Sequence, residues 1–262
     1  NPYQPSAAVA RAIEETLQRG LQKYPDPMGQ PFRRLAAQRF GVQPDWILCG
    51  NGSDDILTIV ISSALSGTLD SALQAKKMLP DANIALVDSQ YTSLPMAFMA
   101  LAAARAAKNG MSLEECVKAV ETVRDHTQVF FAVDTLEFLH RGGRIGGASR
   151  FLGTALQLKP ILFLKDGKIE ALEKVRTSKR AHERLIELVE AEVGDKSPIN
   201  FLGVVHAAAE ETGQGLLKVA EQKFEPEELM FATLSPVLGT HTGPGTIGIA
   251  YVAGINQQQV KD

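Results

Sequence analysis

The chain has 262 residues, of which 45% are hydrophobic, so it can bury a sizeable core as one large domain or two small ones. Its formal net charge of -3, with basic residues scattered among acidic ones, argues against binding to nucleic acid or an anionic membrane. The cysteines, Cys49 and Cys116, match no metal-ligand spacing, and no apolar run approaches the roughly 20 residues of a membrane span. We therefore expect a cytoplasmic protein with buried thiols and no stable membrane insertion.

The opening of the chain is predicted to be helical. Helices are expected at about 6–22 and 31–41, and Pro25 and Pro27 interrupt the chain between them.

From residue 56 onward, strands and helices alternate. The run at 56–61 is continuously apolar and β-branched, as expected of a strand buried on both faces. Further strands are predicted at 83–88 and 129–133. Helices are predicted between these strands at about 69–78, 94–108 and 112–124. The last helix begins with a capping box formed by Ser112 and Glu115. This alternation predicts βαβ units and a mainly parallel sheet.

From Thr135 onward the organisation differs. Short helices are expected on either side of the glycine cluster at 142–147, and a hairpin then turns at Asp166-Gly167. The strands of the hairpin are predicted at 160–164 and 169–173, and later strands at 201–205, 229–233 and 246–252. Helices are predicted at about 178–193 and, after the strand at 201–205, in a segment that ends at 224. We therefore divide the chain into a segment of residues 1–55, a parallel-sheet lobe of residues 56–134 and an α+β lobe of residues 135–262.

Six short motifs follow one another across about 200 residues of the chain. They are ISSALSGT at 61–68, VDS at 87–89, FAVDTLE with LHRGGRI at 131–145, KPIL at 159–162, EKVRT at 173–177 and GTHTGPG at 239–245. In this order they resemble the DegV family of bacterial fatty-acid-binding proteins. The resemblance implies a two-lobed α/β fold and a non-catalytic carrier protein that binds a long-chain fatty acid such as palmitate, stearate or oleate.

Three residues are candidates for holding the carboxylate of such a ligand, which needs an apolar tunnel and a few placed donors. Ser66 precedes a predicted helix and can offer its hydroxyl together with helix N-terminal amides, and His241 lies in a predicted glycine-rich loop. The resemblance implies that Ser66 and His241 hold the carboxylate and that Arg144 supports the head-group end. On the residues alone, Ser66 is more often a helix cap. A structural role for Arg144, capping carbonyls or pairing with Glu137, is there about as frequent as ligand binding.

Arg176 follows the hairpin and is expected to be exposed, which on the residues alone indicates a solvated charge. In family members that serve a fatty acid kinase of the dihydroxyacetone-kinase-like type, the matching arginine faces the kinase. The resemblance therefore implies such a kinase as a partner, contacted through Arg176.

No catalytic residue, cofactor or metal site is predicted. His241 has no cysteine or aspartate at nucleophile–base spacing, and the other four histidines are isolated in the sequence. Neither a GxGxxG fingerprint nor a Walker lysine motif occurs, which argues against nucleotide binding.

Residues 1 to about 55 resemble a different protein, the N-terminal portion of the pyridoxal-phosphate enzyme histidinol-phosphate aminotransferase. The matching stretches are NPY at 1–3, YPDP at 24–27 and WILCGNGSDD at 46–55. Nothing downstream matches the segment that carries the Schiff-base lysine of that enzyme, so transamination is not expected. The first strand of the DegV pattern and its Thr-Ser-Gln-Pro-Ser motif, whose threonine also holds the carboxylate, are missing. We therefore predict a chimera, with a binding-incompetent scaffold or an aminotransferase remnant as the alternatives to fatty-acid binding.

Overall fold

The computed structural model describes residues 30–44, 55–152, 158–194 and 198–255, with five isolated positions among the first 15 residues. The chain divides into two compact units, Asn1–Asp54 and Asp55–Asp262. In the first unit, helix α2 spans Gln30–Phe40, close to the predicted 31–41. Gly41 follows it with a positive φ of 67°, which is typical of a glycine just after a helix. The predicted helix at 6–22 and the aminotransferase-like stretches lie almost wholly outside the described residues.

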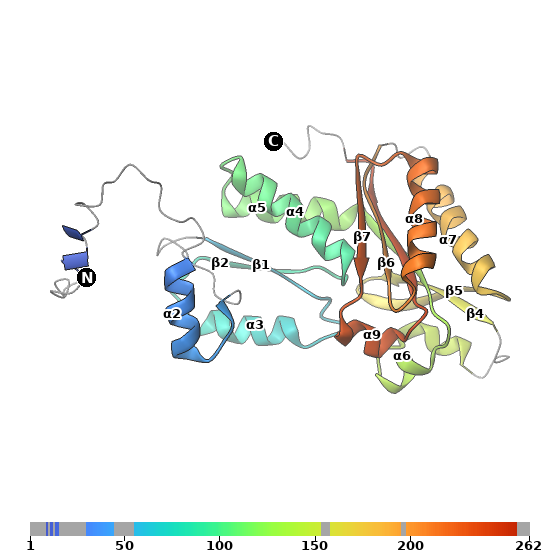
Figure 1. The fold of residues 1–262 in the computed structure, drawn as a ribbon, viewed down its shortest axis with the longest axis horizontal. Coiled ribbons are helices and arrows are strands. Elements are labelled where there is room, and N and C mark those ends of the chain that lie inside the picture. Colours follow the sequence, from blue (N-terminus) through green and yellow to red (C-terminus); the bar gives the residue numbers. More distant parts are fainter. Residues whose placement is uncertain are drawn as a thin grey trace. The chain divides into compact units, whose positions relative to one another are not determined.

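The second unit opens with a small parallel sheet (Figure 1). Strands β1 (Ile56–Val60) and β2 (Ile84–Asp88) pair in parallel, and helix α3 (Thr68–Lys77) connects them. Helices α4 (Leu94–Lys108) and α5 (Leu113–Asp125) follow. These elements confirm the predicted strand–helix alternation over this stretch.

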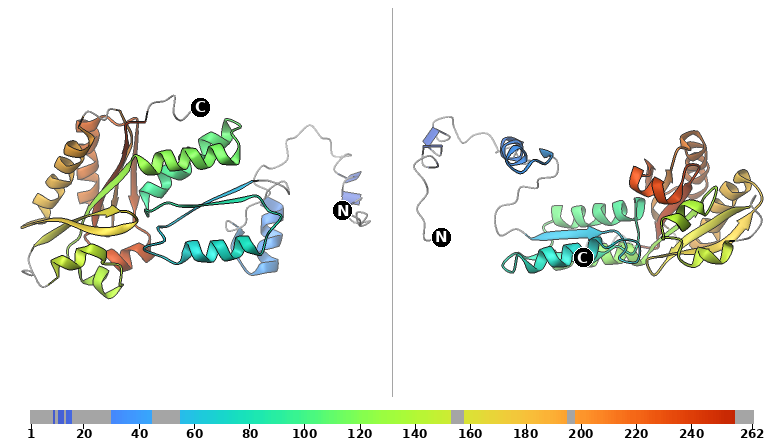
Figure 2. Two further views of the ribbon diagram at one scale, coloured as in Figure 1. Left: turned by 180° about the vertical axis from the view of Figure 1, so that it is seen from behind. Right: turned by 90° about the horizontal axis from the view of Figure 1, so that it is seen from below.

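A six-stranded mixed sheet forms the larger part of the unit (Figures 1 and 2). Its strands are β3 (Thr127–Ala132), β4 (Lys159–Lys165), β5 (Lys168–Val175), β6 (Ile199–His206), β7 (Glu228–Thr233) and β8 (Ile247–Ala253). They lie in the order β5-β4-β3-β8-β6-β7, with β6 and β7 parallel and every other pair antiparallel. The hairpin between β4 and β5 turns at Asp166 and Gly167, whose φ angles of 50° and 76° are those of the predicted tight turn.

Strand β3 differs from its prediction. The sequence predicts a parallel partner, but β3 pairs antiparallel with both β4 and β8. Five of its six residues are buried, so it is apolar on both faces like a strand in a parallel sheet. Hydrophobic patterning therefore identifies a central strand here without identifying the direction of its neighbours.

Helices cover both faces of this sheet. Helices α7 (Ser178–Val193) and α8 (Glu210–Phe224) lie on one face, and α4 packs against the other (Figures 1 and 2). Alternate residues of the central strands supply the two cores: Phe130 and Ile249 face α7, whereas Phe131 and Ala250 belong to the core that includes α4. Two short helices, α6 (Glu137–Arg141) and α9 (Pro236–Thr242), pack against each other, and the 3-10 helix η2 (Gly146–Phe151) lies against β5.

Candidate functional site

A cavity of about 240 Å³ lies where the carboxyl ends of β1 and β2 meet the α4-facing side of the six-stranded sheet. Most of its wall is apolar, formed by Ile61, Leu65, Pro95, Val129, Phe131, Leu139, Leu164, Ile169, Val205, Leu234, Val237 and Leu238. The polar side chains in the wall are Ser66, Thr92, Ser93, Arg144, His241, Thr242 and Thr246. Three of the four site residues singled out from the sequence, Ser66, Arg144 and His241, therefore line one cavity.

The loop that carries Ser66 is fixed at several points. Buried Ser62 donates from its hydroxyl to the carbonyl of Gly167 (2.7 Å) and accepts at its own carbonyl from the Ser66 amide (3.0 Å). The carboxylate of Asp88, at the end of β2, accepts from the amide of Ser63 (3.3 Å), and this bond joins the loop after β1 to the end of β2. The N-cap residue of α3 is Gly67, and no side-chain hydrogen bond caps the helix. The Ser66 hydroxyl instead lies 2.8 Å from the Thr68 hydroxyl. Ser66 precedes the helix as predicted, but its hydroxyl does not serve as the helix cap.

Arg144 lies beside this loop, on the solvent-exposed side of the cavity. Its Nε donates to the Leu65 carbonyl (3.1 Å), and one terminal nitrogen donates to the Gly142 carbonyl (2.7 Å). Glu137 pairs instead with Arg141 (2.5 Å). Of the two roles open on the residues alone, the structure thus shows carbonyl capping, and the guanidinium joins the Ser66 loop to Gly142.

His241 lies in the last turn of α9, so the prediction of a loop position was wrong. The sequence from Pro236 to Thr242 includes a glycine and three β-branched residues, which hid a short helix capped by Ser235, whose hydroxyl accepts from the Leu238 amide (3.4 Å). The Nδ1 atom of His241 is buried and has no hydrogen-bond partner among the residues that the structure describes. It lies so close to Gly142 that any side chain at that position would overlap the ring.

Sequence reasoning missed the second loop of the cavity. Thr92 and Ser93 follow the carboxyl end of β2, as Ser66 follows β1, and in α/β sheets ligands gather at that edge. Ser93 has a φ of 58° and a ψ of -132°, and its side chain makes no capping bond at the start of α4. The position of this loop after a predicted parallel strand could have indicated a place in the site, but no residue type in the loop pointed to ligand binding.

Arg176 does not line the cavity. It is exposed just after β5, as predicted, and makes no ion pair with any residue that the structure describes. His206 is a core residue: its ring stacks on Phe231, accepts from the Ala209 amide (3.3 Å) and lies 3.2 Å from the Thr233 hydroxyl. Cys116 is a buried free thiol, and Cys49 lies outside the described ranges.

Within residues 30–44, 55–152, 158–194 and 198–255, no group of three or more His, Cys, Asp or Glu side chains could hold a metal ion. None of the helices described is long and apolar enough to cross a membrane.

An apolar cavity with a few convergent polar groups, set between a small parallel sheet and a mixed sheet, is the form of a small-molecule-binding α/β protein. The family model "Uncharacterised protein, DegV family" matches residues 47–254. A DegV domain-containing protein of Clostridium acetobutylicum is 39% identical over 202 residues, which are 76% of this chain and 70% of the relative. The chain belongs to the DegV family.

The fold is shared with solved structures of this family. A structure described as "Fatty Acid Binding of a DegV family Protein from Thermus thermophilus" matches with a TM-score of 0.69 and 32% identity, covering 93% of this chain and 84% of that one. The α/β architecture predicted from the sequence is thereby confirmed.

The family match extends into the segment that resembles an aminotransferase. The family model already begins at residue 47. A DegV domain-containing protein of Streptomyces coelicolor is 36% identical over 226 residues, covering 86% of this chain and 75% of the relative. Residues 56–262 make up only 207 of the 262 residues, about 79% of the chain. An alignment that covers 86% of the chain must therefore include part of the first 55 residues.

Proposed function

We propose that this chain is a cytoplasmic, non-catalytic carrier that binds one long-chain fatty acid, such as palmitate, stearate or oleate. The observation that carries the proposal is the cavity, whose apolar wall suits an acyl tail and whose polar side chains include Ser66, Arg144 and His241. The fatty-acid binding named for the Thermus thermophilus family member supports the same ligand class.

In this proposal the carboxylate lies among Ser66, Arg144 and His241. Arg144 bonds to Leu65, the neighbour of Ser66, and to Gly142, which packs on His241, so the three side chains belong to one connected group. A carboxylate offers about four lone-pair positions, which hydroxyl, imidazole and guanidinium donors can fill. The guanidinium, exposed at this edge of the cavity, adds a charge opposite to that of the ligand.

The first test is denaturing mass spectrometry of organic extracts from purified, untreated protein. The expected result is stoichiometric fatty acid. If extracts contain none and the folded protein takes up no added oleate, the proposal fails and the chain acts as a binding-incompetent scaffold.

Replacement of either donor tests the head-group assignment. Ser66→Ala and His241→Ala are each expected to weaken oleate binding by about 1 to 3 kcal/mol, because a buried carboxylate oxygen loses a donor. This corresponds to a dissociation constant raised roughly five- to 150-fold, measurable by calorimetric titration.

Matched controls are Ser63→Ala and His140→Ala, which remove exposed side chains of the same types that do not line the cavity. They are expected to bind oleate as the parent chain does. Unchanged affinity in both test variants would place the carboxylate elsewhere.

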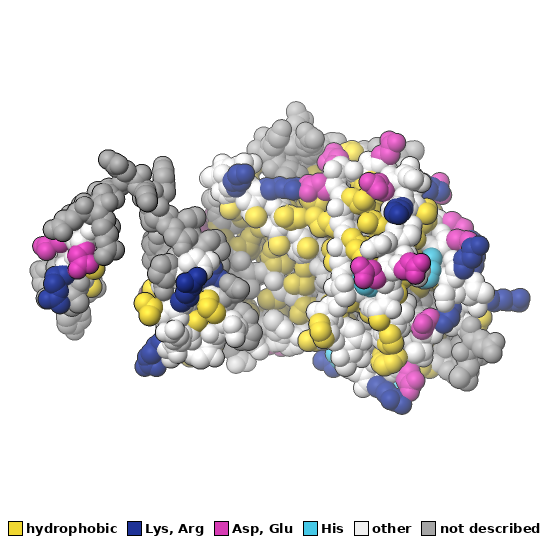
Figure 3. Space-filling view, viewed as in Figure 1, with side chains coloured by type: hydrophobic (Ala, Val, Ile, Leu, Met, Phe, Trp, Pro, Cys, Tyr) yellow, Lys and Arg dark blue, Asp and Glu magenta, His cyan; other side chains and the backbone are white. Residues whose placement is uncertain are grey.

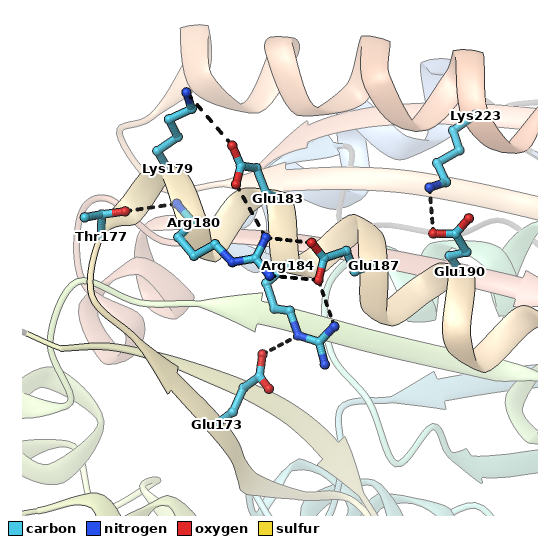
Figure 4. A network of polar contacts seen from close by, with 9 residues as sticks. All are labelled: Glu173, Thr177, Lys179, Arg180, Glu183, Arg184, Glu187, Glu190 and Lys223. Carbon is cyan, nitrogen blue, oxygen red and sulfur yellow. Dashed lines mark hydrogen bonds and ion pairs between the residues drawn. The ribbon is translucent and has the colours of Figure 1, made fainter.

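We further propose that the loaded protein presents the carboxyl group to a fatty acid kinase through Arg176. Charged side chains of both signs are interspersed over α7 and α8 (Figure 3). Those that follow Arg176 are engaged with one another: Lys179 pairs with Glu183 and Arg180 with Glu187 (Figure 4). Arg176 has no such partner within the described part of the chain, so its guanidinium is available to another protein.

Arg176→Ala is therefore expected to leave oleate affinity unchanged and to slow kinase-dependent phosphorylation of the bound acid on the order of tenfold, as for an arginine hot spot. Lys179→Ala, which removes the same charge from the same surface, serves as the control and should change the rate little. A loss of oleate affinity in Arg176→Ala would instead assign this residue to the lipid site.

We propose, finally, that the first part of the chain is of aminotransferase origin and was joined to a DegV sequence. The stretches at 24–27 and 46–55 and the division of the chain into units at Asp54 support this origin, whereas the family match from residue 47 favours a junction before 55. Sequencing the source DNA across the codons of residues 40–70 tests this proposal. One continuous reading frame is expected, and two separate reading frames would exclude a natural fusion.

A further inference from the structure

Three residues on neighbouring strands form a row across the sheet side of the cavity. Phe131 on β3 and Val205 on β6 are both in register with Gly248 on β8, which lies between them. All three line the cavity. The middle of the row has no side chain, so the cavity wall at this point is backbone.

The conformation of Gly248 does not require glycine. It lies within β8, and it is absent from the described residues with positive φ, unlike Gly243 and Gly245 just before it. What a side chain would change is the space: a Cβ at Gly248 would lie 3.2 Å from Phe131 Cβ and 3.2 Å from Val205 Cγ1. A strand glycine without a special backbone conformation often marks a close approach of another group.

The next row along β8 shows the contrast. There Ala250 is in register with Val129 and Gly203; Val129 lines the cavity, but Ala250 and Gly203 do not. A Cβ at Gly203 would lie 2.8 Å from Leu94 Cδ1, so the chain's own side chain fills the space beside this second glycine. Gly248 instead lines the cavity, and it lies two residues, about 7 Å, along the chain from polar Thr246, which immediately precedes β8.

We propose that Gly248 determines the length of acyl chain that the cavity accepts, because the tail passes over β8 where this side chain is missing. The inference rests on the proposed fatty-acid binding and adds a specificity-determining residue to it. A methyl group at this position narrows the path between Phe131 and Val205, so long tails lose affinity relative to short ones.

The test measures dissociation constants for decanoate, myristate, palmitate and stearate by displacement of a fluorescent fatty acid. Gly248→Ala and Gly248→Val should lower the affinity for stearate relative to decanoate on the order of tenfold, with the larger shift for valine. Gly203→Ala adds the same methyl group on the same face of the neighbouring strand, against Leu94, and should leave the order of preference unchanged.

Val205→Ala tests the same path in the opposite direction and does not depend on Gly248 variants folding. It widens the row and should raise the affinity for stearate relative to decanoate. If the parent chain binds none of the four acids, the proposed function itself fails. If the parent chain binds them and neither Val205→Ala nor a folded Gly248 variant alters the preference, this inference alone is overturned.

Discussion

The imidazole of His241 fills the space that a side chain at Gly142 would need, so any side chain there would overlap the ring. The backbone of Gly142 has a φ of -74°, which any residue adopts, so the ring rather than the conformation accounts for the glycine. Gly142→Ala is therefore expected to displace His241, to destabilise the protein by about 1 to 3 kcal/mol, and to weaken oleate binding as His241→Ala does.

A double-mutant cycle with urea denaturation checks this explanation. In the His241→Ala background the space is open, so Gly142→Ala should then cost little stability. Equal costs in both backgrounds would show that the two residues do not compete.

Ser93 holds a backbone conformation that glycine adopts far more readily. With a φ of 58°, a ψ of -132° and no capping bond from its side chain, it carries strain without a compensating contact of the hydroxyl within the described residues. Ser93→Gly should raise the free energy of unfolding by about 1 kcal/mol, measured by urea denaturation. Ser93→Ala retains the Cβ atom and should give no gain, and a destabilised Ser93→Gly would contradict the argument.

Helix α5 begins with a reciprocal pair of bonds that was predicted from the sequence. The Glu115 amide donates to the Ser112 hydroxyl (3.3 Å), and the Ser112 amide donates to the Glu115 carboxylate (2.7 Å). Ser112→Ala removes a helix cap and should cost about 1 kcal/mol of stability.

The stability contributed by the Glu115 carboxylate should depend on pH. The bonds from Ser112 lower the pKa of Glu115 below its ordinary value of 4.5 in the folded state. A lowered carboxyl pKa contributes stability that is present above the unfolded pKa and is lost as pH falls through the folded pKa. Urea denaturation of the parent chain and of Glu115→Ala at pH 7 and at pH 3 should therefore show a smaller difference between the two proteins at the lower pH; an undiminished difference would exclude the carboxylate bond as its source.

Local signals in the sequence predicted most elements closely. The predicted bounds of α4 and α7 are those of the structure, and the hairpin turns at Asp166-Gly167 as expected. Helix α9 was missed because Gly239 and its β-branched residues have low helix propensity, and packing against α6 overrides it. The direction of β3 was missed because burial on both faces looks alike in parallel and central antiparallel strands.

The candidate site was predicted only in part for a similar reason. Ser66, Arg144 and His241 came from motifs, and the fold brings them to one cavity. The apolar wall draws side chains from four strands, three helices and the loops after β1 and β7, so no local pattern identifies it. Gly248 in particular looks like any small residue in a strand until its neighbours Phe131 and Val205 are known.

Binding in the cavity should stabilise the entire second unit. A ligand held only by the folded state adds RT ln(1 + [L]/Kd) to the free energy of unfolding, about 2.7 kcal/mol at a ligand concentration one hundred times Kd. We therefore expect oleate to raise the melting temperature by roughly 5 to 10 °C for a unit of this size. A thermal melt with Ser66→Ala at the same oleate concentration should show a smaller rise, and equal rises would indicate binding outside the cavity.

The place of β8 in the sheet has a consequence for synthesis of the protein. This strand follows all five of the others in the chain, yet it lies at the centre of the sheet and separates β3 from β6. Until the ribosome has released it, β5-β4-β3 and β6-β7 remain two separate ribbons, each with an open edge suited to pairing with another chain. A nascent chain of this protein is thus most exposed to aggregation just before β8 emerges from the ribosome, and a product that lacks β8 forms neither of the two cores completely.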